Sequence, residues 1–392
     1  MNSKLPIMIL MLTLMLMGIG LTMVYSASAS KASSDKRALM KKYDPVAYEK
    51  NAVYHDSHFL VRQAMFAAVG LILMLALSAI DHHRLRAASP VLLGVTFLML
   101  CLVFVPGIGV ESHGAYRWLR MGPVNFQPSE LAKLVMIIFM SKLLLDRQRD
   151  LASFRRGLLP ALLITAVFSA VIVCEPDFGA TVMMVLVLFG LWFIAGMNIF
   201  YLILLIISVI PLGVAAVVTS PYRMQRIKDW LELLNNGLQD DHQVSQSVIA
   251  IGSGGMHGLG LGCSVQKYAF LPEAHTDFIF AVLAEELGFI LAAVVVLLFL
   301  GLIMLGWRVA LRSADSFGGH LASGITLMLA LHVTLNLLVV LGYLPPKGLA
   351  LPFISYGGSS LLVNCAAIGI LMNVAKYNEQ PVAPAKPHKI KH

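Results

Sequence analysis

Three polar segments of this 392-residue chain carry side chains suited to chemistry, and each adjoins a long apolar run. In the first, residues 114–130, Arg117 is of the type that binds a phosphate through paired hydrogen bonds. Glu130 follows shortly after a proline, in a position where a carboxylate stabilises a helix N-terminus. Lys133 lies about one turn farther into the apolar run, where an ionisable group normally has a partner and a task. The alternatives are an interfacial anchor with a well-capped helix and a lysine that snorkels to the surface.

The second polar segment, residues 270–280, leads into an apolar run that contains Glu285 and Glu286. Asp277 lies at the mouth of this run, where a carboxylate can act as a general base or as a helix cap. The two glutamates lie about two turns deeper, where an unpaired charge is costly. They indicate either a functional site or a structural ion pair, and Lys133 is one available partner for Glu285.

The third polar segment, residues 345–360, is rich in Pro, Gly and Ser. Lys347 adds a positive charge, and Ser355 and Ser359 add hydroxyl groups on either side of two glycines. Backbone N–H groups at a helix start can bind an anion where glycines allow close approach. The competing interpretation is a Pro/Gly-rich re-entrant turn without a ligand.

Three further patterns do not predict a cofactor site. The glycine-rich stretch 252–262 lacks the Lys-Ser/Thr ending and the preceding strand of a nucleotide-binding loop. The pair His82-His83 follows Asp81 where a helix is expected to end, and no metal site is predicted there. The cysteines show no paired spacing, which argues against a disulfide framework and a metal cluster. They are Cys101, Cys174, Cys263 and Cys365.

Membrane-spanning helices must position the three polar segments. Hydrophobic residues make up 58% of the chain and charged residues 13%, whereas a soluble domain has roughly 25% charged residues. Its long apolar runs approach or exceed the roughly 18 to 20 residues that a spanning helix needs, and no alternating pattern of a membrane barrel occurs. The predicted spans are residues 6–27, 59–80, 89–108, 128–145, 158–174, 178–197, 199–219, 278–306, 320–342 and 357–375.

The predicted fold is therefore an all-α integral membrane bundle of about ten helices, with both termini in the cytoplasm. The basic residues divide almost evenly between the two sides, but the two longest outer segments, 28–57 and 220–276, weaken that count. The first apolar run exceeds the core of a signal peptide and is expected to remain as the first helix. One polytopic domain is predicted over residues 1–377, followed by a disordered cytoplasmic tail over residues 378–392.

The large outer loop, residues 220–276, lies between the seventh and eighth predicted spans. Within it, apolar side chains recur at helical spacing over residues 224–234, with charged residues between them. This pattern predicts a helix that either lies on the membrane surface or belongs to the loop. The net charge of +8 favours contact with anionic lipid or phosphate, and no nucleic-acid-binding pattern is found.

Five motifs in this order resemble those of the SEDS proteins, a family named for shape, elongation, division and sporulation, and the resemblance covers nearly the whole chain. Two details, Lys347-Gly-Leu and Tyr25-Ser-Ala-Ser28, are similar to the division branch rather than to the elongation branch. The five motifs are Tyr116-Arg-Trp-Leu, Gln127-Pro-Ser-Glu-Leu-Ala-Lys133, Glu175-Pro-Asp-Phe-Gly179, Leu271-Pro-Glu-Ala-His-Thr-Asp-Phe-Ile-Phe280 with Glu285-Glu-Leu-Gly288, and Leu351-Pro-Phe-Ile-Ser-Tyr-Gly-Gly-Ser-Ser360.

The resemblance implies a ten-helix fold and a peptidoglycan glycosyltransferase of the bacterial cytoplasmic membrane, which polymerises lipid II at the division septum. It also implies a class B penicillin-binding protein, the septal transpeptidase, as a partner, together with other membrane proteins of the divisome. Three other functions stay open: an elongation-type polymerase, a lipid II flippase, and a noncatalytic scaffold. The sequence lacks the visible repeat and the broken midplane helices of many transporters.

The implied reaction assigns roles to the residues singled out above. An acceptor sugar hydroxyl attacks the anomeric carbon of the lipid-linked donor in one inverting displacement, and Asp277 is the expected general base. The undecaprenyl pyrophosphate leaving group needs cations, for which a divalent ion, Mg²⁺ or Mn²⁺, is a further candidate. The expected substrate contacts are Arg117, Lys133, Arg223, Lys347, Glu130, Glu285, Ser355 and Ser359.

Overall fold

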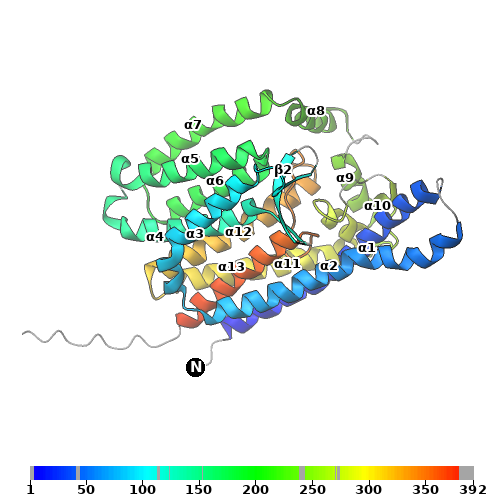
Figure 1. Ribbon diagram of the computed structural model, residues 1–392, viewed down its shortest axis with the longest axis horizontal. Coiled ribbons are helices and arrows are strands. Elements are labelled where there is room, and N and C mark those ends of the chain that lie inside the picture. The colour runs from blue at the N-terminus through cyan, green and yellow to red at the C-terminus, as the bar shows by residue number, and fades with distance from the viewer. Residues whose placement is uncertain are drawn as a thin grey trace, which may run out of the picture.

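The chain forms one bundle of helices that lie side by side (Figure 1). The computed structural model describes all residues except 1–3, 41–44, 113–114, 123, 152, 238–242, 270, 272–273 and 379–392. Within the described part, eight helices are long and apolar enough to cross a membrane. They are α1 (Leu5–Met40), α2 (Pro45–Ala79), α3 (His82–Leu102), α5 (Leu159–Cys174), α7 (Ile199–Val218), α11 (Ile279–Leu311), α12 (Ser316–Val340) and α13 (Gly358–Tyr377).

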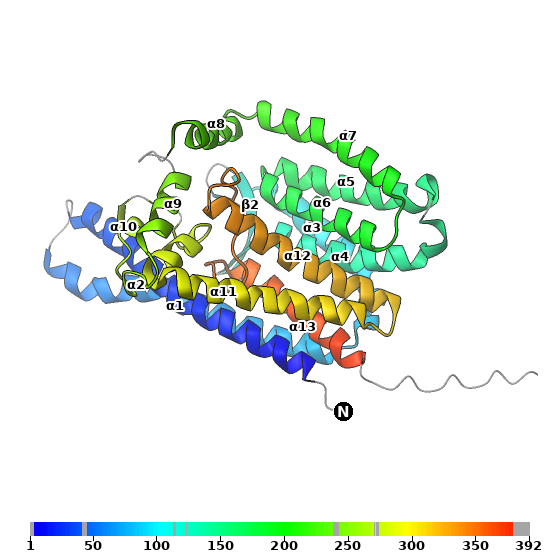
Figure 2. The ribbon, with the colours of Figure 1, turned by 180° about the vertical axis from the view of Figure 1, so that it is seen from behind.

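Two other predicted spans also form helices but fall outside this group. The apolar helix α6 (Phe178–Ile194) is shorter, and α4 (Pro128–Asp146) carries Lys133 and Lys142 among its charged side chains. The prediction of a helical membrane bundle is confirmed, while the count of ten spans stays a prediction. Helix α1 begins at the end of the bundle where α13 ends, as an even number of spans requires (Figures 1 and 2). The side of the membrane on which this end lies stays a prediction.

Apolar side chains cover the outside of the bundle as well as its core. On α7, the side chains of Ile203, Ile207, Ile210 and Val214 are at least half exposed. Water would solvate such a surface poorly, whereas lipid chains solvate it well. Together with helices that satisfy their own backbone hydrogen bonds, this surface fits a bilayer around the bundle.

Small residues let the central helices α2 and α13 approach each other closely. A Cβ on Gly369 would lie 2.4 Å from the backbone oxygen of Met74, and a Cβ on Gly70 would lie 2.9 Å from Sγ of Cys365. Side chains larger than hydrogen would push the two helices apart. Such contacts are a common basis of helix association in membranes, where apolar burial alone gives little driving force.

The first long outer segment, predicted as a loop over residues 28–57, is largely helical. Helix α1 continues to Met40 and α2 begins at Pro45 (Figure 1). Both helices therefore extend beyond their apolar, membrane-spanning parts, which are Leu5–Ser28 and Phe59–Ala79. The end of an apolar run shows where the chain leaves the bilayer, but it does not show where the helix ends. Ala, Lys and Arg in this segment favour a helix in water too. The predicted tail, residues 378–392, lies outside the described residues apart from Asn378.

One short sheet interrupts the otherwise helical fold and was not predicted. Strands β1 (Gly109–Ser112), β2 (Ala115–Met121) and β3 (Val124–Phe126) pair antiparallel in the order β1-β2-β3 between α3 and α4. The strands are only 3 to 7 residues long, so alternation of polar and apolar residues gives little signal over them. The sheet presents Arg117 to the rest of the bundle.

The large outer loop, residues 220–276, also contains regular structure. It forms α8 (Pro221–Asn236), which confirms the predicted helix, followed by α9 (Gln243–Ser253) and the short α10 (Gln266–Ala269). We call the end of the bundle that carries these helices and the sheet the site end. The opposite end, where α13 ends, is the tail end.

Helix α11 is broken at Gly288, where φ is +77°. The glycine-rich stretch 252–262 lies along this break and supplies the missing hydrogen bonds: the N–H of Leu259 donates to Glu285 O at 3.0 Å, and the N–H of Phe289 donates to Gly255 O at 2.9 Å. The glycines therefore allow close backbone contact. The break itself was not predicted.

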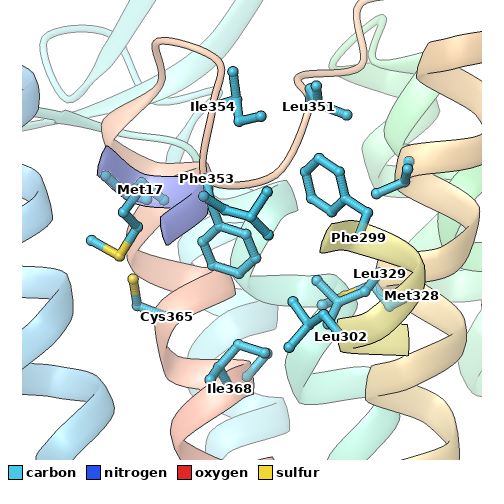
Figure 3. Close-up of a cluster of buried hydrophobic side chains, with 14 of the residues drawn as sticks. Met17, Phe299, Leu302, Met328, Leu329, Leu351, Phe353, Ile354, Cys365 and Ile368 are labelled. Atoms are coloured by element: carbon cyan, nitrogen blue, oxygen red, sulfur yellow. The ribbon is translucent and has the colours of Figure 1, made fainter. Parts of the chain in front are cut away.

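The segment between α12 and α13 turns back into the bundle, as the re-entrant interpretation of the third polar segment predicts. Leu351, Phe353 and Ile354 are at most 3% exposed. Figure 3 shows Phe353 among the side chains of α1, α11 and α13, with Met17 on one side and Phe299 on the other. These apolar contacts fix the position of the polar residues that follow.

Candidate active site

Asp277 lies at the site end, in the turn before α11. Its backbone carbonyl accepts a hydrogen bond of 2.9 Å from Nδ2 of Asn336 on α12, which also donates to Leu349 O at 2.7 Å. A Cβ on Gly348 would lie 3.5 Å from Oδ2 of Asp277, so the carboxylate faces the re-entrant segment. The residue at the cap position of α11 is Phe278, which makes no side-chain capping bond. The cap position of α11 is thus one residue beyond Asp277.

A buried charged cluster joins α4 to α12. Nζ of Lys133 lies 2.7 Å from Oε1 of Glu130 and 3.0 Å from Nε2 of His332. Lys133 is 2% exposed, so its ammonium group stays inside the bundle and does not snorkel. His332 and Asn336 are four residues apart on α12 and share one face. The Lys133 cluster and the turn of Asp277 are therefore neighbours along that face.

Three motifs from distant parts of the chain meet at the start of α4. The backbone N–H of Gln127 donates to Oγ of Ser359 at 3.0 Å. Oδ2 of Asp177 accepts hydrogen bonds from the side chains of Gln127, at 2.9 Å, and Ser129, at 3.0 Å. Asp177 also caps α6 by accepting from the N–H of Ala180 at 3.1 Å. Ser359 is buried, and its hydroxyl positions the start of α4.

Arg117 extends from β2 over the turn between α5 and α6. Its Nε donates to Glu175 O at 3.1 Å, and its Nη2 donates to Pro176 O at 2.8 Å. The side chain of Glu175 is fully buried, and neither carboxylate oxygen has a hydrogen-bond partner among the described residues. Burial, followed by the charge of Asp177, raises the pKa of Glu175 to about 8, while Arg117 opposes the shift. Arg117 thus holds the α5–α6 turn, whose acidic residues Glu175 and Asp177 form what we call the rim of the site.

Helix α8 bridges the start of α6 and the re-entrant segment. The guanidinium carbon of Arg223 lies 5.1 Å from the ring centre of Phe178, at a distance that allows a cation–π interaction. One turn on, Arg226 donates to Pro346 O at 3.2 Å. Lys347 follows in the chain, and burial lowers its pKa. Arg223 therefore lies beside the start of α6, and α8 also contacts the re-entrant segment next to Lys347.

Ser355 joins the re-entrant segment to the turn that contains Asp277. Its hydroxyl donates to Thr276 O at 2.6 Å and accepts from the N–H of Leu351 at 2.8 Å. A second bond runs from the N–H of Tyr356 to His275 O at 3.0 Å. In these contacts the Ser355 hydroxyl supports the position of Asp277. Its predicted role as a substrate contact stays a prediction.

Glu285 belongs to a second buried network, which holds α11 to α10. Its carboxylate accepts a short hydrogen bond from the hydroxyl of Ser264. The neighbouring Glu286 forms an ion pair of 2.6 Å with Lys267 on α10, and both side chains are fully buried. Lys133 does not pair with Glu285, because its described contacts are with α4 and α12. The described side-chain hydrogen bonds of Glu285 are thus with residues at or just before the start of α10, and they do not involve the turn that contains Asp277.

Sequence reasoning assigned no individual role to the polar residues that connect the site, although Gln127 and Asp177 belong to two of the five motifs. Asn336 and His332 hold the two central groups, and Gln127 and Asp177 join the motifs around them. The signal for the first two was present: they are one turn apart inside an apolar run, where polar side chains normally have partners. Lys267 was missed because it lies in the segment that was predicted to be a loop.

The site offers oxygen ligands of the kind that Mg²⁺ and Mn²⁺ prefer. Asp277 provides a carboxylate, and Oδ1 of Asn336 is buried with no hydrogen-bond partner among the described residues. The Glu130 carboxylate is already paired with Lys133. In their donor chemistry, Asp277 and Asn336 fit the predicted divalent ion.

Comparisons with known proteins identify relatives over most of the chain. The profile of a family described as "Cell cycle protein", which comprises FtsW, RodA and SpoVE, matches residues 7–380. Stage V sporulation protein E of Bacillus subtilis (strain 168) is 41% identical over 343 residues, which cover 87% of this chain and 93% of that protein. The probable peptidoglycan glycosyltransferase FtsW of Geobacter sp. (strain M18) is 44% identical over 324 residues, covering 82% of this chain and 88% of that protein.

Solved structures share the fold. A chain of a peptidoglycan synthase complex superposes with a TM-score of 0.72 at 28% identity, covering 95% of this chain and 98% of that chain. The rod shape determining protein RodA of Thermus thermophilus superposes with a TM-score of 0.66 at 27% identity, covering 95% and 97%. Sequence and fold thus agree with the resemblance carried by the five motifs. This chain belongs to the FtsW/RodA/SpoVE family of cell cycle proteins, the SEDS family.

Proposed function

We propose that this protein is a peptidoglycan glycosyltransferase that polymerises lipid II into glycan strands. Its family and its relatives named as probable peptidoglycan glycosyltransferases support the proposal. The observation that carries it is the placement of Asp277: a carboxylate at the end of a membrane bundle, fixed through Asn336 and neighbouring the Lys133 cluster. A lipid-linked sugar anchored in the bilayer would present its headgroup at such an end.

In the proposed reaction Asp277 accepts the proton of an acceptor sugar hydroxyl while that oxygen attacks the anomeric carbon of the donor. The bond from this carbon to the pyrophosphate oxygen breaks in the same step, so the α-linked donor gives a β-linked product. One displacement suffices, and no covalent intermediate with the protein forms. The hydrogen bonds from Asn336 and Ser355 to the turn of Asp277 hold the base in place before the acceptor arrives.

The leaving group is undecaprenyl pyrophosphate, whose negative charge grows as the bond breaks. Lys133, inside the bundle, and Arg223 and Lys347, at the site end, are the proposed contacts that stabilise this charge. Arg117 contributes through the rim that it organises. A divalent ion, when bound by Asp277 and Asn336, would supply further positive charge to the pyrophosphate.

A lipid II flippase is the second candidate, and the break in α11 at Gly288 favours it. Discontinuous helices are common at the substrate sites of transporters. However, the glycine-rich stretch forms hydrogen bonds with the free backbone groups at this break. The nearby carboxylates are also already paired, because Glu285 accepts from the N–H of Val265 and Glu286 accepts from Nζ of Lys267. The break therefore supports transport less strongly than the Asp277 geometry supports polymerisation.

We further propose a class B penicillin-binding protein, the septal transpeptidase, as the partner, and action at the division septum of the bacterial cytoplasmic membrane with other divisome proteins. Support comes from the relatives named FtsW and from the similarity to a chain of a peptidoglycan synthase complex. An elongation-type role is the alternative, since RodA shares the fold.

One reconstitution separates these functions. The purified protein, alone and with a class B penicillin-binding protein, is placed in liposomes with labelled lipid II, and glycan strands are resolved on a gel while an impermeant reagent reports movement of the label across the bilayer. Polymerisation predicts strands, most strongly with the partner. Movement without strands would establish a flippase instead, and neither strands nor movement would leave a scaffold.

A further inference from the structure

A second polar cluster lies at the tail end, at the opposite ends of α11, α12 and α13 from the candidate active site. Asp81 caps the start of α3, His82 and His83 are the first two residues of that helix, and Asp315 caps the start of α12. The potential ligand atoms of Asp81, His82 and His83 all lie within 4.8 Å of one another. The proposed polymerase reaction uses none of these residues.

Both histidines have their Nδ1 atoms held by hydrogen-bond acceptors. Nδ1 of His82 lies 3.0 Å from Oδ1 of Asn373, which must be the amide oxygen because it also accepts the backbone N–H of His82, while Nδ2 donates to Ser78 O. Nδ1 of His83 lies 2.8 Å from Oδ1 of Asp81. Nδ1 is therefore the protonated nitrogen of each ring, and Nε2 of a neutral ring carries a lone pair.

The two Nε2 atoms face the same carboxylate. Nε2 of His82 lies 3.1 Å from Oδ1 of Asp315, and Nε2 of His83 lies 3.8 Å from Oδ2. Ligands of a tetrahedral zinc ion, at about 2.0 to 2.2 Å from the metal, are roughly 3.3 Å from each other. The two nitrogen–oxygen separations, one to each oxygen of the Asp315 carboxylate, bracket this value. Two lone pairs and a carboxylate that converge in this way repel one another unless a cation lies between them or the rings are protonated.

The surroundings of the three groups match the second shell of a metal site. Metal-bound histidines generally donate their other N–H to a carboxylate or carbonyl oxygen, as His83 does to Asp81 and His82 to Asn373. Oδ2 of Asp315 accepts the N–H of Gly318 at 2.9 Å. The Asp315 and His83 side chains are 25% and 37% exposed, so an ion can reach them.

We propose that His82, His83 and Asp315 bind one divalent transition-metal ion of the zinc class. Two imidazole nitrogens and a carboxylate favour zinc-like ions over Mg²⁺ or Ca²⁺, which prefer oxygen ligands alone. Asp81 and Asn373 orient the two rings and do not bind the ion. Because its ligands lie at the starts of α3 and α12, and Asn373 lies on α13, the ion joins three helices at the tail end.

The test uses the full chain, purified with a tag that contains no histidine and stripped with a chelator. His388 and His392 are replaced by Ala in every sample, so that terminal histidines do not bind the probe. Zn²⁺ is then titrated and the bound metal is measured after gel filtration, while Co²⁺ reports tetrahedral ligation through its visible absorption. The expected result is one ion per chain and a higher midpoint of thermal unfolding with Zn²⁺ than without.

Single variants then assign the ligands. His83→Ala and Asp315→Asn should each abolish binding and the rise in midpoint, although Asn keeps the helix cap because it caps about as well as Asp. Asp81→Asn should weaken binding by about 10- to 100-fold, as loss of an orienting partner does. His257→Ala, which removes a histidine at the site end, should bind as the parent does.

Two results would overturn the proposal. One is an absence of Zn²⁺ binding at micromolar concentration in the parent, in which case the rings are protonated partners of Asp315. The other is unchanged binding in both His83→Ala and Asp315→Asn. The unfolding midpoint without metal shows whether each variant is folded, and if one of them is not, the other decides. Glycan polymerisation does not enter the readout, so failure here is distinct from failure of the proposed function.

Discussion

Asn336 donates a hydrogen bond of 2.9 Å from its side-chain amide to the backbone carbonyl of Asp277. The same amide nitrogen donates to Leu349 O at 2.7 Å. One side chain on α12 therefore fixes both the turn before α11 and the re-entrant segment that faces it. The orientation of the Asp277 carboxylate depends on this link between three distant parts of the chain.

Removing the link should impair the reaction more than the fold. Asn336→Ala leaves two buried carbonyls without donors, which costs about 1 to 3 kcal/mol of unfolding free energy. Displacement of the base should lower the polymerisation rate by about 100-fold. Asn364→Ala is the matched control, because this buried amide donates to Ser360 O within its own helix. Equal rate losses in the two variants, at equal stability, would argue that Asn336 does not position Asp277.

The Lys133 cluster should separate stability from activity. Lys133→Met leaves the Glu130 carboxylate without its partner of 2.7 Å and should destabilise the protein by up to about 3 kcal/mol. Adding Glu130→Gln removes the unpaired charge, so the double variant should regain much of this stability yet still fail to make glycan strands. Lys142→Met, farther along the same helix, is the control for loss of a lysine. A double variant that polymerises lipid II at the parent rate would exclude Lys133 from the reaction.

Glu175 should make stability depend on pH. Its pKa is raised to about 8 in the folded protein, so between its unfolded value and pH 8 the folded state binds the proton more tightly. Stability contributed by the neutral acid is therefore greatest at low pH and is lost as pH rises through about 8. Thermal unfolding from pH 5 to 9 should show a decline that Glu175→Gln removes and that Glu111→Gln, at an exposed position, retains. Parallel curves for the parent and Glu175→Gln would contradict the shift.

The orientation can be tested with an impermeant thiol reagent. Cys263 lies exposed directly after the glycine-rich stretch, at the site end, and should react in intact cells. The sequence predicts that it is the only accessible cysteine, but Cys174 is also exposed, at the last residue of α5. Labelling of a Cys174→Ser variant therefore reports Cys263 without interference from its neighbour. Reaction only after permeabilisation would place the site end in the cytoplasm.

Much of this architecture follows from residue patterns. Apolar runs of spanning length predict the helices, because a bilayer admits few other structures. Ionisable residues inside those runs, Glu130, Lys133 and Glu286, point to buried partners, since their charges are costly when unpaired. All three are paired in the structure. Asp277 required the family resemblance, because a lone acid before a helix is also consistent with a cap.

The identity of the partners could not be derived from the same patterns. Lys133 was considered with Glu285, yet it pairs with Glu130 one turn away and with His332, because the position of α12 beside α4 is decided by tertiary packing. The break at Gly288 was hidden in a continuous apolar run. Only the return of the glycine-rich stretch, which bonds the freed backbone groups, makes such a break tolerable.

The most direct measurement is the polymerisation of labelled lipid II by Asp277→Asn, with a class B penicillin-binding protein present. Asn keeps the size of the side chain and removes its basicity, so the rate should fall by about 10²- to 10⁴-fold. The variant should still enter the membrane and bind its partner, and Asp229→Asn, which alters a carboxylate on α8, should polymerise as the parent does. Glycan strands formed by Asp277→Asn at close to the parent rate would contradict the assignment of the base, and Glu130 would become the next carboxylate to test.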